Sequence, residues 1–432
     1  MAACRRAALV GDRRQLVVLV SFSDQQFRES EPLTLWNRIF NEEGLSEEPF
    51  YGSVHDYFLA QSYGQLNLAF DLHAIALEES RIKYRSTSSD DENSKYLVSD
   101  LVEVLKGEDI DWSQYDWDGD GYIDQLLIVY AGKGQNAGGG SSSIWPHQWW
   151  MSQHEGTAPL PVSSGGEEYL VDCYCCVQEI YSGNDYGSFG TICHEYSHCF
   201  GLPDFYYSST SYLRDWDLMD YGNNNKGGFC PPNYSAHERW LMGWLTPVEL
   251  TMGTTVSDMP ATTDHDVAYL IRNDGYDNEF YIVENRQQTG WDRSLPGSGV
   301  VVFHIDYDEE VWRELMPNTP SGQRYTIIPA NNRSMTAFSY GWAYPYGTND
   351  ALTDTSQPAA TLRNANAAGT LLMRKPLTDI AVTAGQASFV FNGGSTAIQH
   401  TTQDVRPQTL YQMGPLRIVR MADGAVRKIV KP

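Results

Sequence analysis

The sequence feature that most restricts the fold is the stretch from Gly190 to Asp204, G-T-I-C-H-E-Y-S-H-C-F-G-L-P-D. It contains two histidines, His194 and His198, four positions apart, and Glu195 directly follows the first. Residues four apart share one face of a helix, and the apolar and aromatic neighbours favour a buried one. The spacing is typical of a zinc site in which two imidazoles hold the metal and the glutamate is a base toward water.

The residues after the second histidine predict where this helix ends and what completes the site. Gly201 can take a positive φ without a Cβ clash, which ends a helix. Pro203 cannot continue a helix, and the resulting turn directs Asp204 back toward the histidines. We therefore expect Asp204 to be the third zinc ligand. A buried histidine pair that only packs in the core is the structural alternative.

The complete motif, His194-Glu195-x-x-His198-x-x-Gly201-x-x-Asp204, resembles the immune inhibitor A family of secreted bacterial metallopeptidases, which are relatives of the metzincins. Most metzincins have a histidine at the third position, so an aspartate there is typical of this subgroup. The resemblance implies a zinc metalloendopeptidase that acts on proteins or peptides. It also implies that Glu195 accepts a proton from the attacking water and passes it to the leaving amine.

A second segment, Trp216 to Gly222 (W-D-L-M-D-Y-G), resembles the metzincin Met-turn, which places a methionine beneath the zinc. Tyr221 follows Met219 by two residues, at the position from which some metzincins supply a phenol to the transition state. The resemblance therefore implies that Tyr221 is catalytic together with Glu195. Ordinary core packing of Met219 and Tyr221 is the alternative.

An acidic bend upstream is a candidate calcium site, because oxygens at alternate positions around a glycine suit a hard cation. It differs from an EF-hand in having Leu127 at the position of the bidentate glutamate, and a strand-like run from Gln125 to Tyr130 follows it. The alternative is an acidic turn before a strand. The four candidate ligands are Asp116, Asp118, Asp120 and Asp124.

Composition restricts the partners of this 432-residue chain. A formal net charge of −25 disfavours nucleic acid and anionic membranes. No apolar run approaches the roughly 18 residues of a membrane span. We expect a monomer that is secreted or at the cell surface. The resembled family is exported and made with a propeptide; neither signal is visible here, which leaves open a native start upstream of Met1.

The cysteines leave two interpretations open. An odd number excludes complete pairing within the chain, while disulfides suit an exported protein. Buried thiols that pack as small apolar groups are the alternative. The seven positions are Cys4, Cys173, Cys175, Cys176, Cys193, Cys199 and Cys230.

The predicted fold class is α+β, with a metzincin-like zinc-protease domain followed by a β-sandwich-like domain. We expect an N-terminal extension at 1–15, the catalytic domain at 16–246, the β-rich domain at 247–395 and a tail at 396–432. The first half has a strand at Leu16–Phe22 and an amphipathic helix at Lys95–Lys106 whose apolar face includes Val104. Strands are predicted in the second half at 268–272, 279–284, 299–305, 325–328 and 387–391.

The tail contains two β-type runs, 416–421 and 425–430, that predict a hairpin and resemble the C-terminal sorting segments of exported bacterial proteins. Two other functions stay open for the whole chain. One is an inactive or non-peptidase zinc hydrolase, such as an amidase, and the other is a surface binding protein with a vestigial site. The complete set of motif residues argues against a vestige, because no structural role demands all of them.

Overall fold

The computed structural model describes residues 9–87, 91–181, 183, 185–314, 316–335, 339–399, 408–413, 416–420 and 426–430. The chain is a mixed α/β protein, in agreement with the expected α+β class, and it forms two compact units. Unit 1 comprises Met1–Leu59, Gln65–Asp204 and Asp217–Pro232, and unit 2 comprises Ala60–Gly64, Phe205–Trp216 and Asn233–Pro432. Within the described ranges, no helix is long and apolar enough to cross a membrane.

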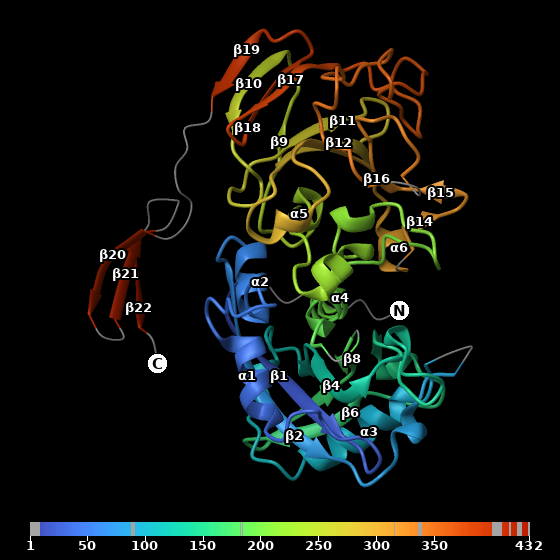
Figure 1. The fold of residues 1–432 in the computed structure, drawn as a ribbon, viewed down its shortest axis with the longest axis vertical. Helices are drawn as coiled ribbons and strands as arrows, with labels where there is room; N and C mark the ends of the chain where they lie inside the picture. Colours follow the sequence, from blue (N-terminus) through green and yellow to red (C-terminus); the bar gives the residue numbers. More distant parts are fainter. Residues whose placement is uncertain are drawn as a thin grey trace. The chain divides into compact units, whose positions relative to one another are not determined.

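A five-stranded sheet with the order β2-β1-β4-β8-β5 organises unit 1 (Figure 1). Its first four strands are parallel, and β5 at the edge is antiparallel to β8. The predicted first strand is confirmed, although it begins earlier, at Gly11. Its apolar run is fully buried because helices and loops cover both faces of a parallel sheet. The bounds are β1 Gly11–Ser21, β2 Leu66–Ala76, β4 Leu126–Lys133, β5 His147–Trp150 and β8 Cys173–Ile180.

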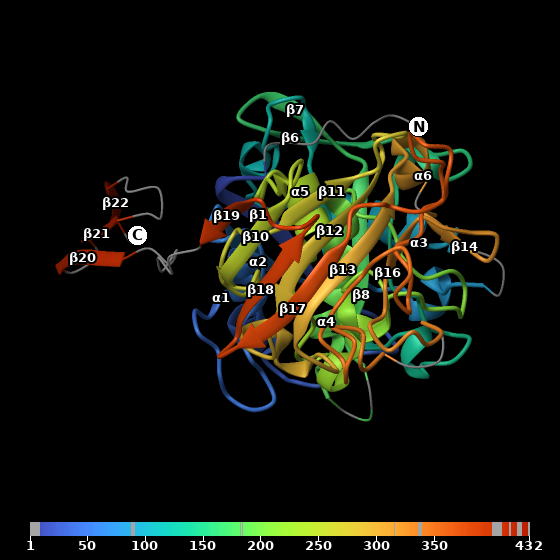
Figure 2. The same ribbon diagram turned by 90° about the horizontal axis from the view of Figure 1, so that it is seen from above.

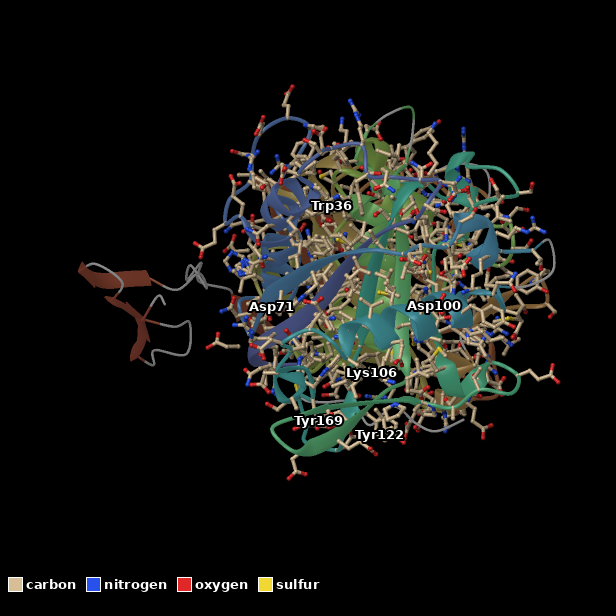
Figure 3. The ribbon with its side chains drawn as sticks, turned by 90° about the horizontal axis from the view of Figure 1, so that it is seen from below. Trp36, Asp71, Asp100, Lys106, Tyr122 and Tyr169 are labelled. Carbon is tan, nitrogen blue, oxygen red and sulfur yellow. The ribbon has the colours of Figure 1, made fainter. Side chains whose placement is uncertain are left out.

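Helix α3 (Ser94–Leu105) packs its apolar face against this sheet. Figure 3 labels Asp100 on this helix and Lys106, which directly follows it. The predicted helix is confirmed, but Val104 is exposed rather than buried. A small sheet of order β3-β7-β6 carries Tyr122 and Tyr169, also labelled in Figure 3. The other elements of unit 1 are α1 Pro32–Asn41, α2 Val54–Gln61, β3 Tyr122–Ile123, β6 Leu160–Ser164, β7 Glu167–Val171 and α4 Ser188–Cys199.

The cysteines of the described ranges pack as thiols. Five of these six side chains are buried, and none of the six is in a disulfide. The second interpretation of the sequence therefore holds for this part of the chain. Cys4 lies outside the described residues.

Unit 2 contains two larger sheets, and Figure 2 shows β17 and β18 overlying β12 and β13. One hydrophobic core includes residues of both sheets, so the sheets pack face to face. All five strands predicted for this part are confirmed. The first sheet has the order β16 (Tyr325–Ile327), β13 (Gly299–Asp306), β12 (Glu279–Arg286), β11 (Tyr269–Arg272) and β9 (Val248–Glu249). The second has the order β17 (Leu377–Thr383), β18 (Gln386–Phe391), β10 (Thr254–Met259) and β19 (Thr396–Gln399).

A buried group of charged side chains joins distant segments of unit 2. Arg239 on α5 (Ala236–Leu241) donates to the Tyr63 hydroxyl at 2.8 Å and to the Thr262 carbonyl at 2.7 Å. Arg286 donates two 2.6 Å hydrogen bonds to the carboxylate of Asp292. Both arginines are almost completely buried, so each depends on these partners for the hydrogen bonds it loses from water.

Unit 2 also includes helix α6 (Glu309–Arg313) and a short pair, β14 (Asn318–Thr319) with β15 (Gly322–Gln323). The tail forms a separate sheet of β20 (Gln408–Met413), β21 (Leu416–Arg420) and β22 (Val426–Val430). Strands β21 and β22 are antiparallel, which confirms the predicted hairpin, while β20 is an additional strand. The turn residues 421–425 lie outside the described ranges.

Candidate active site

Helix α4 carries the two motif histidines, as the sequence predicts, and almost all of its residues are buried. It ends at Cys199, and Gly201 follows with φ = 85°, a left-handed conformation that costs little without a Cβ atom. The Gly201 N–H donates to the His198 carbonyl at 2.7 Å. The turn then brings Leu202 and Asp204 back along the end of the helix.

Two backbone carbonyls orient the imidazole rings. Nδ1 of His194 lies 2.9 Å from the Leu218 oxygen, and Nδ1 of His198 lies 2.7 Å from the Leu202 oxygen. A carbonyl oxygen only accepts, so we assign the proton of each neutral ring to Nδ1. Each Nε2 then presents a lone pair. The ring centroids are 4.9 Å apart and the ring planes are nearly perpendicular.

Asp204 completes a set of three acceptor atoms. Its Oδ1 lies 3.1 Å from Nε2 of His194 and 3.3 Å from Nε2 of His198. Among the described residues, this oxygen is buried without a hydrogen-bond donor, although the side chain as a whole is 30% exposed. Ligands of a tetrahedral zinc ion, at about 2.0–2.1 Å from the metal, lie roughly 3.3 Å from each other. The three residues therefore fit a zinc ion in both chemistry and spacing.

The pKa values of these side chains also indicate that the site favours a positive charge. Burial alone would lower the pKa of His194, but the facing carboxylates of Asp204 and Glu195 raise it to about 9. Burial would raise the pKa of Asp204, but His198 and His194 hold it well below its usual range. Without a metal, a proton on His194 thus supplies the charge that the carboxylate requires.

Glu195 lies beside these side chains and shares helix α4 with the two histidines. A carboxylate oxygen of Glu195 and one ring nitrogen of each histidine all lie within 4.8 Å of one another. The side chain is buried, and burial raises the pKa of Glu195, which the two histidines oppose only in part. A carboxylate with a raised pKa is a stronger base, as a group that takes a proton from water must be.

The segment that follows, Asp217 to Gly222, contacts the metal-site helix through the Leu218 carbonyl. Asp217 shapes this segment, because its Oδ1 accepts from the Met219 N–H at 2.8 Å and its carbonyl accepts from the Gly222 N–H at 2.9 Å. Met219 is fully buried, whereas Tyr221 is 37% exposed. Tyr221 begins the 3-10 segment η6 (Tyr221–Gly228).

Sequence reasoning missed the residues that bring η6 against α4. A Cβ atom on Gly190 would lie 1.9 Å from the Asn223 carbonyl oxygen, so only glycine permits this approach. A glycine inside a buried helix, where it costs stability, was the available signal. The carbonyls of Leu202 and Leu218 had none, because any residue type offers a carbonyl.

The acidic bend is only partly assembled. Asp116, Asp118 and Asp120 bring carboxylate oxygens within 4.8 Å of one another. Asp124 is not in this group; its Oδ2 accepts from the Trp117 N–H at 2.5 Å. Burial raises the pKa of Asp124 to about 7, the Trp117 N–H opposes that rise, and the neighbouring aspartates add to it.

Comparisons with known proteins agree with this geometry. The sequence profile of the immune inhibitor A peptidase M6 catalytic domain matches residues 11–240. Immune inhibitor A of Bacillus thuringiensis subsp. alesti is 27% identical over 304 residues, covering 57% of this chain and 43% of that protein. The pre-pro-metalloprotease PrtV of Vibrio cholerae serotype O1, matched in two strains, is 29% identical over 177 residues, covering 34% of this chain and 18% of PrtV.

The chain therefore spans less than half the length of the curated relatives that it matches. The profile covers more than half of the chain and contains the whole motif from His194 to Asp204, together with Tyr221. The resemblance inferred from the motif is confirmed, and the chain belongs to the immune inhibitor A peptidase M6 family.

Proposed function

We propose that this protein is a zinc-dependent endopeptidase that hydrolyses peptide bonds of proteins. One observation carries the proposal: three acceptor atoms, of His194, His198 and Asp204, converge beside the buried carboxylate of Glu195, and no described residue donates to the Asp204 oxygen. A zinc ion held there would polarise a substrate carbonyl and lower the pKa of water. Family membership supports the same assignment.

Two side chains perform the proton chemistry in this proposal. The Glu195 carboxylate takes a proton from the attacking water and later gives it to the leaving amine. The Tyr221 phenol donates a hydrogen bond to the oxyanion as that charge forms, a contact that stabilises the transition state more than the substrate. The Tyr221 side chain is partly exposed at the start of η6.

The sheet edge supports a peptide as the substrate. Strand β5 ends the five-stranded sheet, so one side of its backbone has no neighbouring strand among those of that sheet, and β5 contacts α4. An extended peptide can add to such an edge through main-chain hydrogen bonds. Trp149 on β5 is 37% exposed and offers an apolar contact for a substrate side chain.

Three further assignments belong to this proposal. We assign a metzincin-like fold to the catalytic part and a β-sandwich to the two sheets of unit 2 that share a core. The name of the relative described as a pre-pro-metalloprotease supports export, and we assign this protein to the secreted or cell-surface proteins, as a monomer. The convergence of Asp116, Asp118 and Asp120 supports a calcium ion at the acidic bend.

The test combines metal analysis with cleavage mapping. The purified protein should contain about one zinc per chain and cut a denatured protein mixture at internal peptide bonds, as mapped by mass spectrometry. A chelator should stop cleavage, and zinc should restore it. Tight zinc binding with no cleavage of any protein or peptide would favour the inactive hydrolase instead.

A further inference from the structure

A cavity lies in unit 1 at the carboxyl ends of three neighbouring parallel strands. None of the residues of the candidate metal site lines it. Its volume is ≈ 470 Å³. Gln25 and Arg28 follow β1, Lys133 ends β4, and Ile180 ends β8. The chain leaves β1 for β2 on one side and later enters β4 on the other (Figure 1). Open α/β sheets bind ligands at this kind of switch point.

The cavity is positively charged in a protein whose net charge is −25. Arg28, Arg81 and Lys133 line it, and Glu179 is the single acidic residue among the described lining residues. Glu179 is committed elsewhere, because its two oxygens accept from the backbone N–H groups of Arg28 and Gly132, each at 2.8 Å. Burial raises the pKa of Glu179, and these two backbone N–H groups oppose that rise. The lining therefore has an excess of cationic groups.

Two of the cations have bonding capacity to spare. Within the described ranges, neither Arg81 nor Lys133 forms an ion pair, and no hydrogen bond engages the Lys133 ammonium. Nε of Arg81 is buried without an acceptor, and its NH1 makes only a long 3.4 Å contact with the Lys133 carbonyl. The remaining N–H groups of Arg81 and the Lys133 ammonium are therefore left to bind an anion.

The glycine-rich turn of this cavity does not itself supply donors. The N–H of Gly138 donates to the Gln135 carbonyl and that of Gly139 to the Gly134 carbonyl at 2.8 Å. A Cβ atom on Gly139 would lie 2.5 Å from the Lys133 carbonyl oxygen, so the turn folds tightly on itself. Recognition of a ligand must therefore come from side chains, unlike in a phosphate loop, where backbone N–H groups hold the anion.

We propose that this cavity binds a small oxyanion, a phosphate or sulfate, through Arg81 and Lys133 with Arg28 adding positive charge. Planar guanidinium and ammonium groups are the usual partners of such anions. A volume of ≈ 470 Å³ accommodates an oxyanion that is attached to a small organic body as well as a free ion. The shared chemistry of both sources is the tetrahedral oxyanion.

The site is separate from the metal site of the proposed protease function. Ser188, the first residue of α4, donates from its hydroxyl to the Glu179 carbonyl at 3.0 Å. His194 and His198 follow six and ten residues later, which corresponds to about 9 and 15 Å of helix rise. The oxyanion proposal does not rest on peptidase activity and fails or stands independently of it.

Calorimetric titration of the zinc-loaded protein tests the proposal, with chloride holding the ionic strength constant. The probes are sulfate, which leaves zinc in solution, and galactose 6-sulfate. We expect saturable binding of at least one probe. Equal affinities would assign the site to the free ion, and tighter binding of the sugar sulfate would assign it to an ester.

Substitutions locate the bound anion. Lys133→Met should weaken binding about 10-fold or more, because a hydrogen bond to a charged group is lost, while Lys133→Arg should retain most of the affinity. Lys106→Met removes one lysine from the end of α3 and should bind like the unmodified protein. Unchanged melting temperatures without sulfate would verify folding. Absence of saturable binding, unchanged binding by Lys133→Met, or loss of binding on zinc chelation alone would overturn the proposal.

Discussion

Oδ1 of Asp204 lies 3.1 Å from Nε2 of His194, and no hydrogen-bond donor in the described part of the chain satisfies that oxygen. Two lone pairs that face each other at this distance repel unless a proton or a cation lies between them. A positive charge between these atoms therefore stabilises the site. This stabilisation makes the contribution of each ligand measurable.

Asp204→Asn keeps the shape of the side chain but removes the charge that balances the metal. We expect the affinity for zinc to fall by about 100-fold or more, with peptide hydrolysis falling alongside it. Competition with a fluorescent zinc chelator would measure the change. Asp109→Asn removes one exposed carboxylate of the same unit and should bind zinc normally. Tight zinc binding and full turnover in Asp204→Asn would assign the third ligand to another residue.

Glu195→Gln should separate metal binding from catalysis. The amide cannot accept the proton of the attacking water, so hydrolysis should become undetectable while about one zinc per chain remains bound. Metal analysis and cleavage of a quenched fluorescent peptide would measure the two effects on the same sample. Loss of zinc would show that Glu195 is a ligand rather than a base.

Tyr221→Phe removes only the phenol oxygen of a partly exposed ring. If that oxygen contacts the oxyanion alone, kcat should fall about 10-fold or more while KM changes little. Steady-state kinetics with one peptide would distinguish the two constants. An unchanged kcat would assign Tyr221 to packing or to surface structure.

Calcium should stabilise the protein if the acidic bend binds it. Binding only to the folded state at about 100 times Kd adds roughly 2.7 kcal/mol, so millimolar calcium should raise the melting temperature of the zinc-loaded protein. The double variant Asp118→Ala, Asp120→Ala should lose this rise, whereas Glu108→Ala, Asp109→Ala, two exposed acids nearby, should keep it. If the unmodified protein has the same melting temperature with calcium and with a calcium-selective chelator, the bend is an acidic turn that binds no calcium.

His237 should make unit 2 sensitive to acid. Its ring is buried among aromatic side chains and has no hydrogen-bond partner among the residues that the structure describes, and burial lowers the pKa of His237 to about 3. Between that value and about 6.5, the unfolded chain binds more protons, so the free energy of unfolding falls as pH drops. At pH 5, His237 lowers the free energy of unfolding by about 2 kcal/mol relative to neutral pH.

His237→Phe should remove this contribution because a phenyl ring fits the aromatic surroundings and takes no proton. Urea unfolding at pH 5 and pH 7.5 would measure it as a smaller loss of stability at pH 5 than in the unmodified protein. His265→Phe, a change at a half-buried histidine, should leave the pH dependence intact. Equal acid sensitivity in His237→Phe would place the labile group elsewhere.

The metal-site helix and its ligands were predictable because their spacing is local. Two histidines four apart, with a glycine and an aspartate after them, determine one helix face and one turn whatever the rest of the chain does. The convergence of Asp204 on both Nε2 atoms follows from that turn. The five β-type runs of the second half were likewise recognisable from alternation and β-branched residues.

Other elements gave weak or misleading signals. Strand β8 carries Cys173, Cys175 and Cys176. In the sequence alone, these cysteines are possible disulfide partners, and no strand is predicted there. Strands β10 and β17 are short and polar in part, so their register depends on pairing with β18 rather than on their own pattern. The carbonyls that orient His194 and His198 belong to Leu218 and Leu202, and tertiary structure alone brings the first of them into place.

The buried arginine Arg239 has a practical consequence for anyone who divides this protein. Its partners come from residues 61–63 on one side in sequence and from Thr262 on the other. A chain shortened to residues 16–246 would keep Arg239 but lose Thr262. The guanidinium would then lose one of its acceptors and part of the structure that buries it. Recombination between relatives at that point would face the same penalty. A division at residue 246 therefore cuts through unit 2, which takes up the chain again at Asn233, and separates Arg239 from one of its acceptors.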